Sequence, residues 1–309
     1  MKQFFLNSLL IVIFIIMLAF PEIVLEGSCT GLLLWFRTIL PTLLPFLIIS
    51  GLIINTSCIH LLTKISSPVF CRLFHLSEYG SFAALSGFLC GYPMGAKVTS
   101  DLLSTNKISY TEAKYLLSFC NNTSPAFIIS YVIHQNLNAS HLVIPTIAIL
   151  FISPIIISFL FRCFYDLSTA ELNTNIFKSN DRKSPVDLMD RCIMKSFETI
   201  TKIGGYIMLF SILTSIFSKI FTSSNFLKII FLSFLEITNG ISLISQSEMS
   251  FSMKYIFTLA LVSFGGWCSV AQTRCMISET EIPLFPYIIE KLITTMVTSL
   301  LAFLFMKFY

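Results

Sequence analysis

The sequence LSFCNNTSP at residues 117–125 ends an apolar helical run in a polar break, and LSFLEITNG at residues 232–240 has the same form. The two segments share Leu, Ser, Phe and Thr in the same register. Each half of the chain also holds a glycine-interrupted segment, SGFLCGYPMGAK at residues 86–97 and VSFGGWCSVAQTR at residues 262–274. Matched breaks in two halves indicate an internal repeat whose broken helices line a site.

The composition predicts the surroundings of these helices. The chain has 309 residues, of which 55% are hydrophobic and 12% are charged, and its mean hydropathy is +0.83. An ordinary soluble domain has about 45–50% apolar and about 25% charged residues, so this chain could not cover its surface in water. The composition excludes a disordered chain, a secreted disulfide scaffold and a typical cytosolic enzyme. It predicts an all-α polytopic membrane protein in a lipid bilayer.

The basic residues divide the chain. Seven of the 20 Lys and Arg residues lie between Arg162 and Lys202, and this basic stretch marks the cytoplasmic side under the positive-inside rule. We expect one membrane domain over residues 1–309, with a first half at 1–165, a cytoplasmic linker at 166–185 and a second half at 186–309. Acidic residues interleave with the bases and no aromatic residues line a groove, so we expect no nucleic-acid partner.

Apolar runs predict the individual segments, with about five full spans and several broken or short ones. The first run, at 4–20, reads as an uncleaved helix with its N-terminus inside. An interfacial helix ending near residue 40, a span at 42–54 and an amphipathic surface segment at 58–78 follow. Ser109 and Glu112 form a capping box that begins a helix running to about Cys120. The further predicted segments are spans at 142–161, 203–221 and 284–308 and an amphipathic helix at 186–199.

The four breaks carry the candidate binding residues. A break inside hydrocarbon leaves backbone groups unpaired, each at a cost of about several kcal/mol, unless it lines a polar cavity. Half-helix N-termini there would offer N–H donors and a partial positive charge to an anion. The candidate solute-binding residues are Gly91, Tyr92, Pro93, Gly95, Asn121, Asn122, Thr123, Ser124, Pro125, Glu236, Thr238, Asn239, Gly240, Gly265, Gly266 and Gln272. The alternative is that NNTSP and EITNG are loops at the membrane surface.

Charged residues in apolar surroundings are the other candidates, because an unpaired charge at mid-bilayer costs about 3 kcal/mol or more. Glu236 is the main candidate for a coupling or substrate-sensing acid, and an interfacial glutamate is the alternative. Glu290 and Lys291 are expected to snorkel or to pair, in a structural role. Lys97 would meet an anionic substrate or anchor at the cytoplasmic surface. We expect no cofactor and no metal, with the coupling ion open between H⁺ and Na⁺.

The motifs SGFLCGYPMGAK, ISYTEAKYLLSFCNNTSPAFI, LEITNG and FGGWCSVAQ together resemble the nucleoside-recognition, or Gate-domain, membrane proteins. Within that group they are most similar to the sporulation integral membrane proteins of the YlbJ type. The resemblance covers the chain from about residue 32 to the C-terminus. The chain is shorter than is usual in this branch, which puts the substrate in doubt more than the fold.

The resemblance implies a fold like that of the concentrative nucleoside transporters, with hairpins and unwound helices around a central site. For the sporulation branch it implies a multi-pass bacterial cell-membrane carrier, with the outer forespore membrane as a candidate location. Its solute would be dipicolinic acid, moving from the mother cell toward the forespore. The alternatives are a nucleoside-type carrier and a sporulation membrane assembly protein that transports nothing. A homo-oligomer is left open.

An intramembrane enzyme is the last alternative, and the residues do not favour it. The sequence has no H-E-x-x-H, no G-x-S-x-G and no paired carboxylates, and its four histidines lie near segment ends or in loops. We therefore expect no catalytic residue.

Overall fold

The computed structural model describes residues 2–165, 184–220 and 226–309, and these residues form helices and connecting turns without a strand. Within them, six helical stretches are long and apolar enough to cross a membrane. They are Pro21–Ile54, Tyr110–Leu137, Ser140–Arg162, Pro185–Lys219, Phe251–Met276 and Leu284–Phe308. The predicted all-α polytopic membrane protein is confirmed. Most of the predicted linker, at 166–183, lies outside the described residues.

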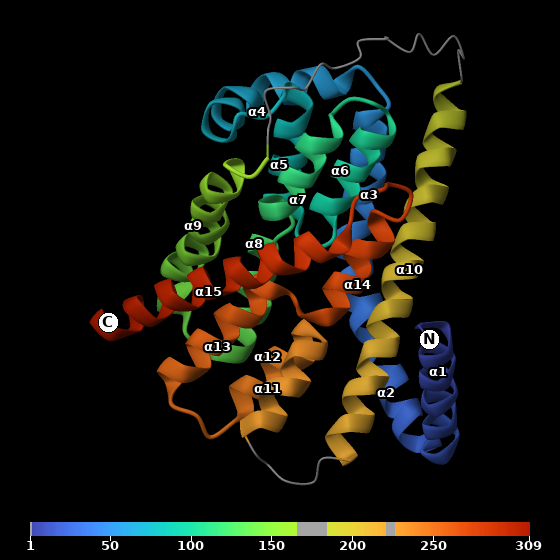
Figure 1. Cartoon of the computed structure of the whole chain (residues 1–309), viewed down its shortest axis with the longest axis vertical. Coiled ribbons are helices and arrows are strands. Elements are labelled where there is room, and N and C mark those ends of the chain that lie inside the picture. Colours follow the sequence, from blue (N-terminus) through green and yellow to red (C-terminus); the bar gives the residue numbers. More distant parts are fainter. Residues whose placement is uncertain (1, 166–183, 221–225) are drawn as a thin grey trace.

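An N-terminal arm of helices lies along one side of the molecule (Figure 1). After α1 (Lys2–Ala19), the arm consists of α2 (Pro21–Leu34), the π-helical turn η1 (Trp35–Ile39) and α3 (Leu40–Ile54). The prediction of an interfacial helix that ends near residue 40 is wrong, because α2, η1 and α3 run on without a gap. Pro41 lies in the first turn of α3, where a missing N–H is tolerated, and the wide π turn precedes it.

Helix α10 (Pro185–Ile220) packs closely against this arm. A Cβ atom at Gly27 would lie 2.8 Å from the Ile212 Cα, and one at Gly31 would lie 2.8 Å from the Met208 Cα. Small residues four positions apart let two membrane helices approach in this way. The predicted amphipathic helix at 186–199 and the span at 203–221 are therefore parts of one helix as far as residue 220.

The rest of the chain uses one pattern twice. A helical hairpin comes first, then an interrupted helix, then an unbroken helix that packs on it. In the first half these are α5 (Glu78–Cys90) with α6 (Met94–Ser104), then α7 (Tyr110–Cys120) with α8 (Pro125–Phe127) and the π helix η2 (Ile128–Leu137), then α9 (Val143–Arg162). In the second half they are α11 (Phe226–Leu235) with α12 (Ile237–Gln246), then α13 (Phe251–Phe264) with α14 (Gly266–Met276), then α15 (Leu284–Phe308).

This order corrects the alignment that the sequence favoured. LSFCNNTSP interrupts the spanning stretch 110–137, whereas LSFLEITNG forms the tip of the hairpin α11–α12. By position in the repeat, α11–α12 corresponds to α5–α6, and α13–α14 corresponds to α7–α8. The two hairpins lie toward opposite ends of α10, α5–α6 where it begins and α11–α12 where it finishes (Figure 1). The two halves are thus arranged in opposite directions across the molecule.

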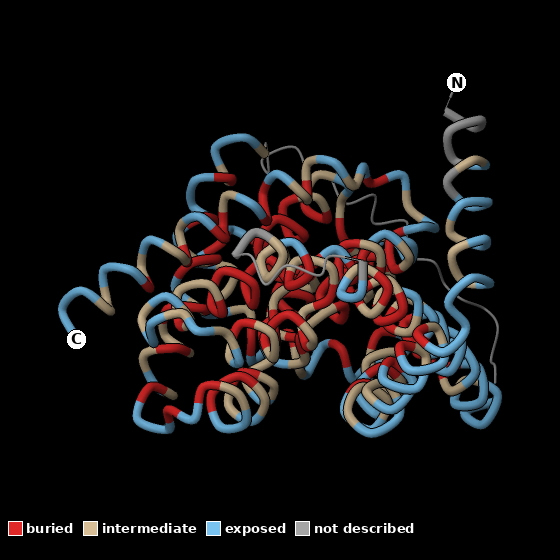
Figure 2. Tube along the Cα trace, turned by 90° about the horizontal axis from the view of Figure 1, so that it is seen from below, coloured by how far each residue is buried: buried red, intermediate tan, exposed pale blue. Residues whose placement is uncertain are grey.

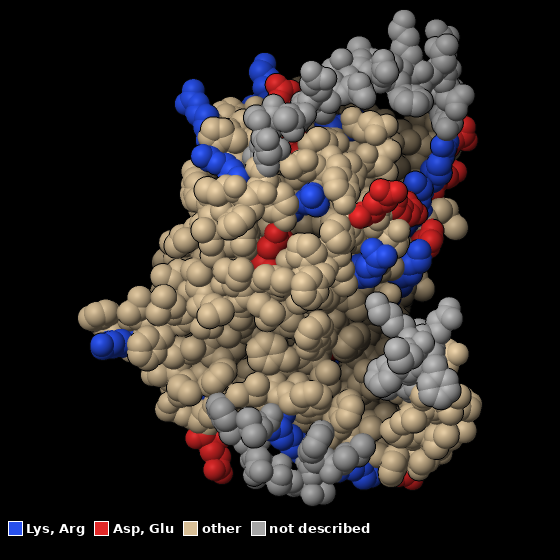
Figure 3. Space-filling model, viewed as in Figure 1, with Lys and Arg blue, Asp and Glu red and all other residues tan. Residues whose placement is uncertain are grey.

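Buried residues gather in the middle of the molecule, and α1 stands outside that region with its described residues exposed or half-buried (Figure 2). A large apolar cluster includes side chains of α5, α6 and α7, and another includes side chains of η2, α12 and α13. On the face seen in Figure 3, charged side chains lie over the upper half and at the lower end, and a largely uncharged band lies between them. Such a band suits the hydrocarbon of a bilayer.

Helix α4 (Cys58–Phe74) lies across the end of the molecule at which α10 begins (Figure 1). Ile59 and Phe74 are buried against the protein, whereas Ile65 and Val69 are exposed. This is the amphipathic surface segment that the sequence predicted.

Candidate functional site

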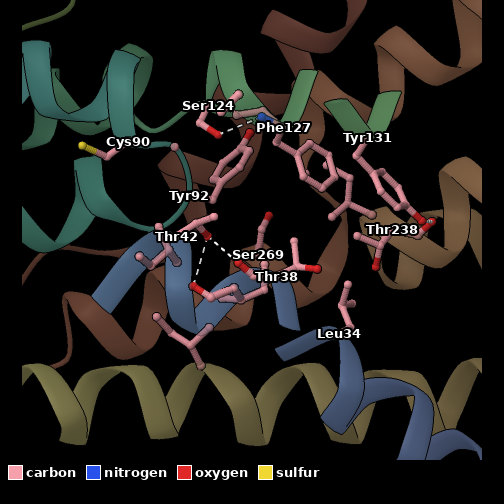
Figure 4. A pocket seen from close by; sticks show the side chains of 18 of the residues that line it. Leu34, Thr38, Thr42, Cys90, Tyr92, Ser124, Phe127, Tyr131, Thr238 and Ser269 are labelled. Carbon is pink, nitrogen blue, oxygen red and sulfur yellow. Dashed lines mark hydrogen bonds between the residues drawn. The ribbon is translucent and has the colours of Figure 1, made fainter. Parts of the chain in front are cut away.

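A cavity of about 540 Å³ lies where the hairpin tips and the two interrupted helices come together (Figure 4). Ile203 and Ile207 form part of its wall and lie near the middle of α10, so the cavity is far from both ends of that helix. The other apolar walls come largely from η1 and α3. The polar and aromatic side chains in the lining include Thr38, Thr42, Tyr92, Thr123, Ser124, Phe127, Ser130, Tyr131, Gln135, Glu236, Thr238, Ser269 and Gln272.

The tip of the hairpin α5–α6 reaches the opposite half of the molecule. Gly91 has φ +86°, and a Cβ atom there would lie 2.7 Å from the backbone nitrogen of Ser124. Glycine fits both the left-handed backbone and this close approach. The Tyr92 hydroxyl donates to the Ser263 carbonyl at 2.8 Å and so fixes the tip against the end of α13.

The break after α7 is held by Asn121, which is fully buried. Its Nδ2 donates to Thr273 Oγ1 and to the Tyr287 hydroxyl, each at 2.9 Å, and its Oδ1 accepts from the Ala96 N–H at 3.4 Å. One amide therefore joins α6, α14 and α15. Thr123 Oγ1 donates to the Val262 carbonyl at 2.9 Å. Two of these bonds satisfy backbone groups at the other breaks, the Ala96 N–H in the first turn of α6 and the Val262 carbonyl near the end of α13.

The tip of α11–α12 is formed by Glu236, which is 2% exposed. Its carboxylate accepts from the Thr238 N–H at 3.1 Å, from the Asn239 N–H at 2.9 Å and from the Thr238 hydroxyl. Glu236 is thus the N-cap of α12, and its negative charge lies at the positive end of that helix. Burial at a helix N-terminus does not fit the alternative of an exposed surface loop.

The break between α13 and α14 consists of Gly265 and Gly266, with φ of +86° and +77°. A Cβ atom at Gly265 would lie 2.5 Å from Ser269 Oγ and 2.9 Å from Tyr92 Cζ. Both glycines are in the region that disfavours other residues, and Gly265 also makes room for the Tyr92 ring. The predicted break is therefore present, and it abuts the first hairpin.

The candidate residues divide into two groups. Those that line the cavity are Gly91, Tyr92, Thr123, Ser124, Glu236, Thr238, Gly265 and Gln272. Those behind the lining are Pro93, Gly95, Asn121, Asn122, Pro125, Asn239, Gly240 and Gly266. Gly95 and Gly240 permit close packing, because Cβ atoms there would lie 2.5 Å from the Cys120 carbonyl oxygen and 2.4 Å from the Ser233 carbonyl oxygen.

Sequence reasoning missed one wall of the cavity and part of another. Thr38 and Thr42 line the cavity from η1 and α3. They are four positions apart, a spacing that places two polar residues on the same face of a helix and could have indicated this wall. Phe127 and Tyr131 enter from the half-helix after the break, with ring centroids 5.0 Å apart. The Tyr131 hydroxyl donates to the Thr238 carbonyl at 2.9 Å, which links this half-helix to the opposite hairpin.

The charged residues of the candidate set do not pair as expected. The Glu290 carboxylate accepts from the Tyr165 hydroxyl, whereas Lys291 Nζ donates to Asn122 Oδ1 at 3.0 Å. The expectation that the two neighbours pair or snorkel is therefore wrong, because they are buried and bond to different elements. Lys97 bonds to Asp101 at 2.5 Å and does not line the cavity.

Comparison with known proteins gives a whole-length relative. The chain is 26% identical to the "Sporulation integral membrane protein YlbJ" of Bacillus subtilis (strain 168) over 340 aligned residues, which cover 98% of this chain and 83% of that protein. No protein-family model matches the chain, and no solved structure matches it. Together with the six candidate spans, this similarity indicates a multi-pass membrane protein. Over nearly the whole of its length, this chain is thus similar to a sporulation integral membrane protein of the YlbJ type.

Proposed function

We propose that this protein carries a small polar or anionic solute across the membrane, and that the solute is dipicolinic acid moving from the mother cell toward the forespore. The observation that carries the proposal is the cavity of about 540 Å³ at the junction of the helix breaks. Its volume lies in the range of about 300–1,000 Å³ that small-molecule sites occupy. Irregular backbone at membrane depth is tolerated where it lines such a cavity.

The arrangement of the two halves favours a transporter over a protein that only binds a solute. The hairpins enter from opposite ends, and their tips bond across the middle through Tyr92 to Ser263 and through Tyr131 to Thr238. In transporters built from inverted repeats, one half rocks against the other around a site between them. Each end of the cavity could then be opened by releasing one hairpin tip.

The lining suits a flat, polar ring. Tyr92, Phe127 and Tyr131 offer aromatic faces, and hydroxyl and amide groups from Thr38, Ser269 and Gln272 offer donors and acceptors (Figure 4). A pyridine dicarboxylate and a nucleobase both have this form. A nucleoside-type solute is the second candidate, because the described side chains that line the cavity include a carboxylate, Glu236, and no Lys or Arg.

Flux into proteoliposomes tests the proposal. Labelled dipicolinate and a labelled nucleoside are offered to the wild type, to Glu236→Gln and to Glu248→Gln. Glu248 is exposed and outside the cavity, so it is the matched control. We expect dipicolinate uptake by the wild type and by Glu248→Gln, and its loss in Glu236→Gln. Nucleoside uptake alone would change the solute, and uptake of neither by folded protein would favour an assembly role.

A further inference from the structure

Lys291 is a buried cation that neither the fold nor the proposed carriage explains. It lies in the last candidate span and is 1% exposed. Placing an ammonium group there is costly, and such residues usually face a cavity or a partner of opposite charge. Within the described residues, the ion pairs join Lys97 to Asp101 and Lys202 to Glu198, so Lys291 takes part in none of them.

The neighbouring carboxylate does not serve as its partner. Glu290 precedes Lys291 on α15, and adjacent residues on a helix do not face one another. The Glu290 carboxylate instead accepts a hydrogen bond from the hydroxyl of Tyr165, a residue that follows α9 in the sequence. The two side chains therefore bond to different elements, although their charges still attract one another, and the ammonium group contacts residues of the first half.

Lys291 instead contacts two residues that belong to the breaks. Its Nζ donates to Asn122 Oδ1 at 3.0 Å and lies 5.0 Å from the centroid of the Tyr92 ring. Asn122 belongs to the break after α7, and Tyr92 lines the cavity. The electron-rich face of a tyrosine ring attracts a cation at this distance. The ammonium group therefore lies directly behind one wall of the cavity.

The carboxylate in the cavity wall does not cancel this charge. Both oxygens of Glu236 accept hydrogen bonds at the first turn of α12, where the helix dipole also stabilises negative charge. Lys291 contacts an amide oxygen and an aromatic face, the Cys120 and Glu290 side chains also act on it, and no ion pair joins it to a carboxylate among the described residues. In a medium of low polarity, its field reaches through the ring into the cavity.

We propose that Lys291 determines the charge specificity of the site: it attracts an anionic solute from behind Tyr92 and so favours it over a neutral solute of the same shape. This inference rests on the proposed carriage. Lys291 is a specificity-determining and positioning residue, since Tyr92 and Asn122 separate it from the solute.

The test compares two solutes of one shape, pyridine-2,6-dicarboxylate and its neutral diamide, pyridine-2,6-dicarboxamide. Uptake of each into proteoliposomes gives a ratio of kcat/KM values. Lys291→Gln keeps a donor for Asn122 and removes the charge, so we expect the ratio to fall by about tenfold or more, as for the loss of one charge roughly 10 Å away. Lys291→Arg keeps the charge and should keep the preference. Glu290→Gln, the matched control, should not lower the ratio.

An isosteric variant tests the inference without removing the lysine. Asn122→Asp places a carboxylate 3.0 Å from Nζ and neutralises it in place. We expect this variant to lose the preference for the dicarboxylate, as Lys291→Gln does. If Lys291→Gln does not fold, Asn122→Asp is a sufficient test by itself. An unchanged ratio in the folded variants would overturn the inference and leave carriage standing. Equal losses for both solutes would show a structural role and also overturn it. No uptake of either solute by the folded wild type would overturn the proposed function first, and this inference with it.

Discussion

The polar breaks at Asn121 and at Glu236 look alike in the sequence, where the two residues align, but they are built differently. Asn121 is fully buried and bonds to three other elements, α6, α14 and α15. Glu236 bonds to the first turn of its own helix and forms part of the cavity wall. The Asn121 side chain therefore joins the two halves, whereas the Glu236 side chain lines the cavity. The partners of a break, rather than its residue pattern, decide its role.

We expect the largest loss of stability from Gly87→Ala, because the added methyl group pushes α5 away from the break after α7. A Cβ atom at Gly87 would lie 1.8 Å from the Cys120 carbonyl oxygen, so backbone has to move. We expect a loss of about 3 kcal/mol in the free energy of unfolding, at the upper end for overpacking. Thermal unfolding in detergent measures it. Gly205→Ala is the control, because nothing lies within 4 Å of a Cβ atom there, and it should unfold at or above the wild-type temperature.

Asn121→Ala comes next and tests whether this break joins the halves. It removes three hydrogen bonds and leaves buried partners at Thr273 and Tyr287, which should cost about 2–3 kcal/mol. The expected result is a lower unfolding temperature and less accumulated protein. Asn239→Ala, at the other break, loses only a 3.4 Å bond to Ser211 and should cost under about 1 kcal/mol. Equal destabilisation by the two variants would remove the distinction between the breaks.

Glu236→Gln should have a smaller effect on stability than Asn121→Ala and a large effect on uptake. The amide keeps one oxygen for the N-terminus of α12 and turns a nitrogen toward the other N–H donor, at a cost of about 1 kcal/mol. If Glu236 serves the site, solute uptake is lost while the unfolding temperature falls little. A variant that unfolds as readily as Asn121→Ala would instead make Glu236 another structural residue.

The sequence could predict where helices stop. Ser109 begins α7 as expected, since its Oγ accepts from the Glu112 N–H at 3.1 Å, and the glycines at 265 and 266 end α13. Such signals are local, because they depend on a few neighbouring residues. The second half of the capping box does not form, because the Glu112 carboxylate accepts from the Ser77 N–H at 2.7 Å instead. A partner 35 positions away is beyond what a local pattern encodes.

The partners of the breaks could not be predicted for the same reason. Two helical runs that end in polar residues look the same whether the chain then continues forward or turns back on itself. Lys291 and Asn122 are 169 positions apart and become neighbours only once the last helix packs on the first half. The threonines at 38 and 42 lie in an apolar stretch, and only packing of the N-terminal arm brings them to the cavity.

The most direct test of a solute pathway through this cavity is to fill it. Thr42 lines the cavity from α3 and is exposed, so Thr42→Trp adds bulk without displacing the core. Ile49→Trp, further along α3 at a residue that is 53% exposed and not in the lining, is the matched control. Uptake of dipicolinate into proteoliposomes is measured for both beside the wild type. The account predicts that Thr42→Trp abolishes uptake while Ile49→Trp retains it, at equal unfolding temperatures, and wild-type uptake by folded Thr42→Trp would contradict it.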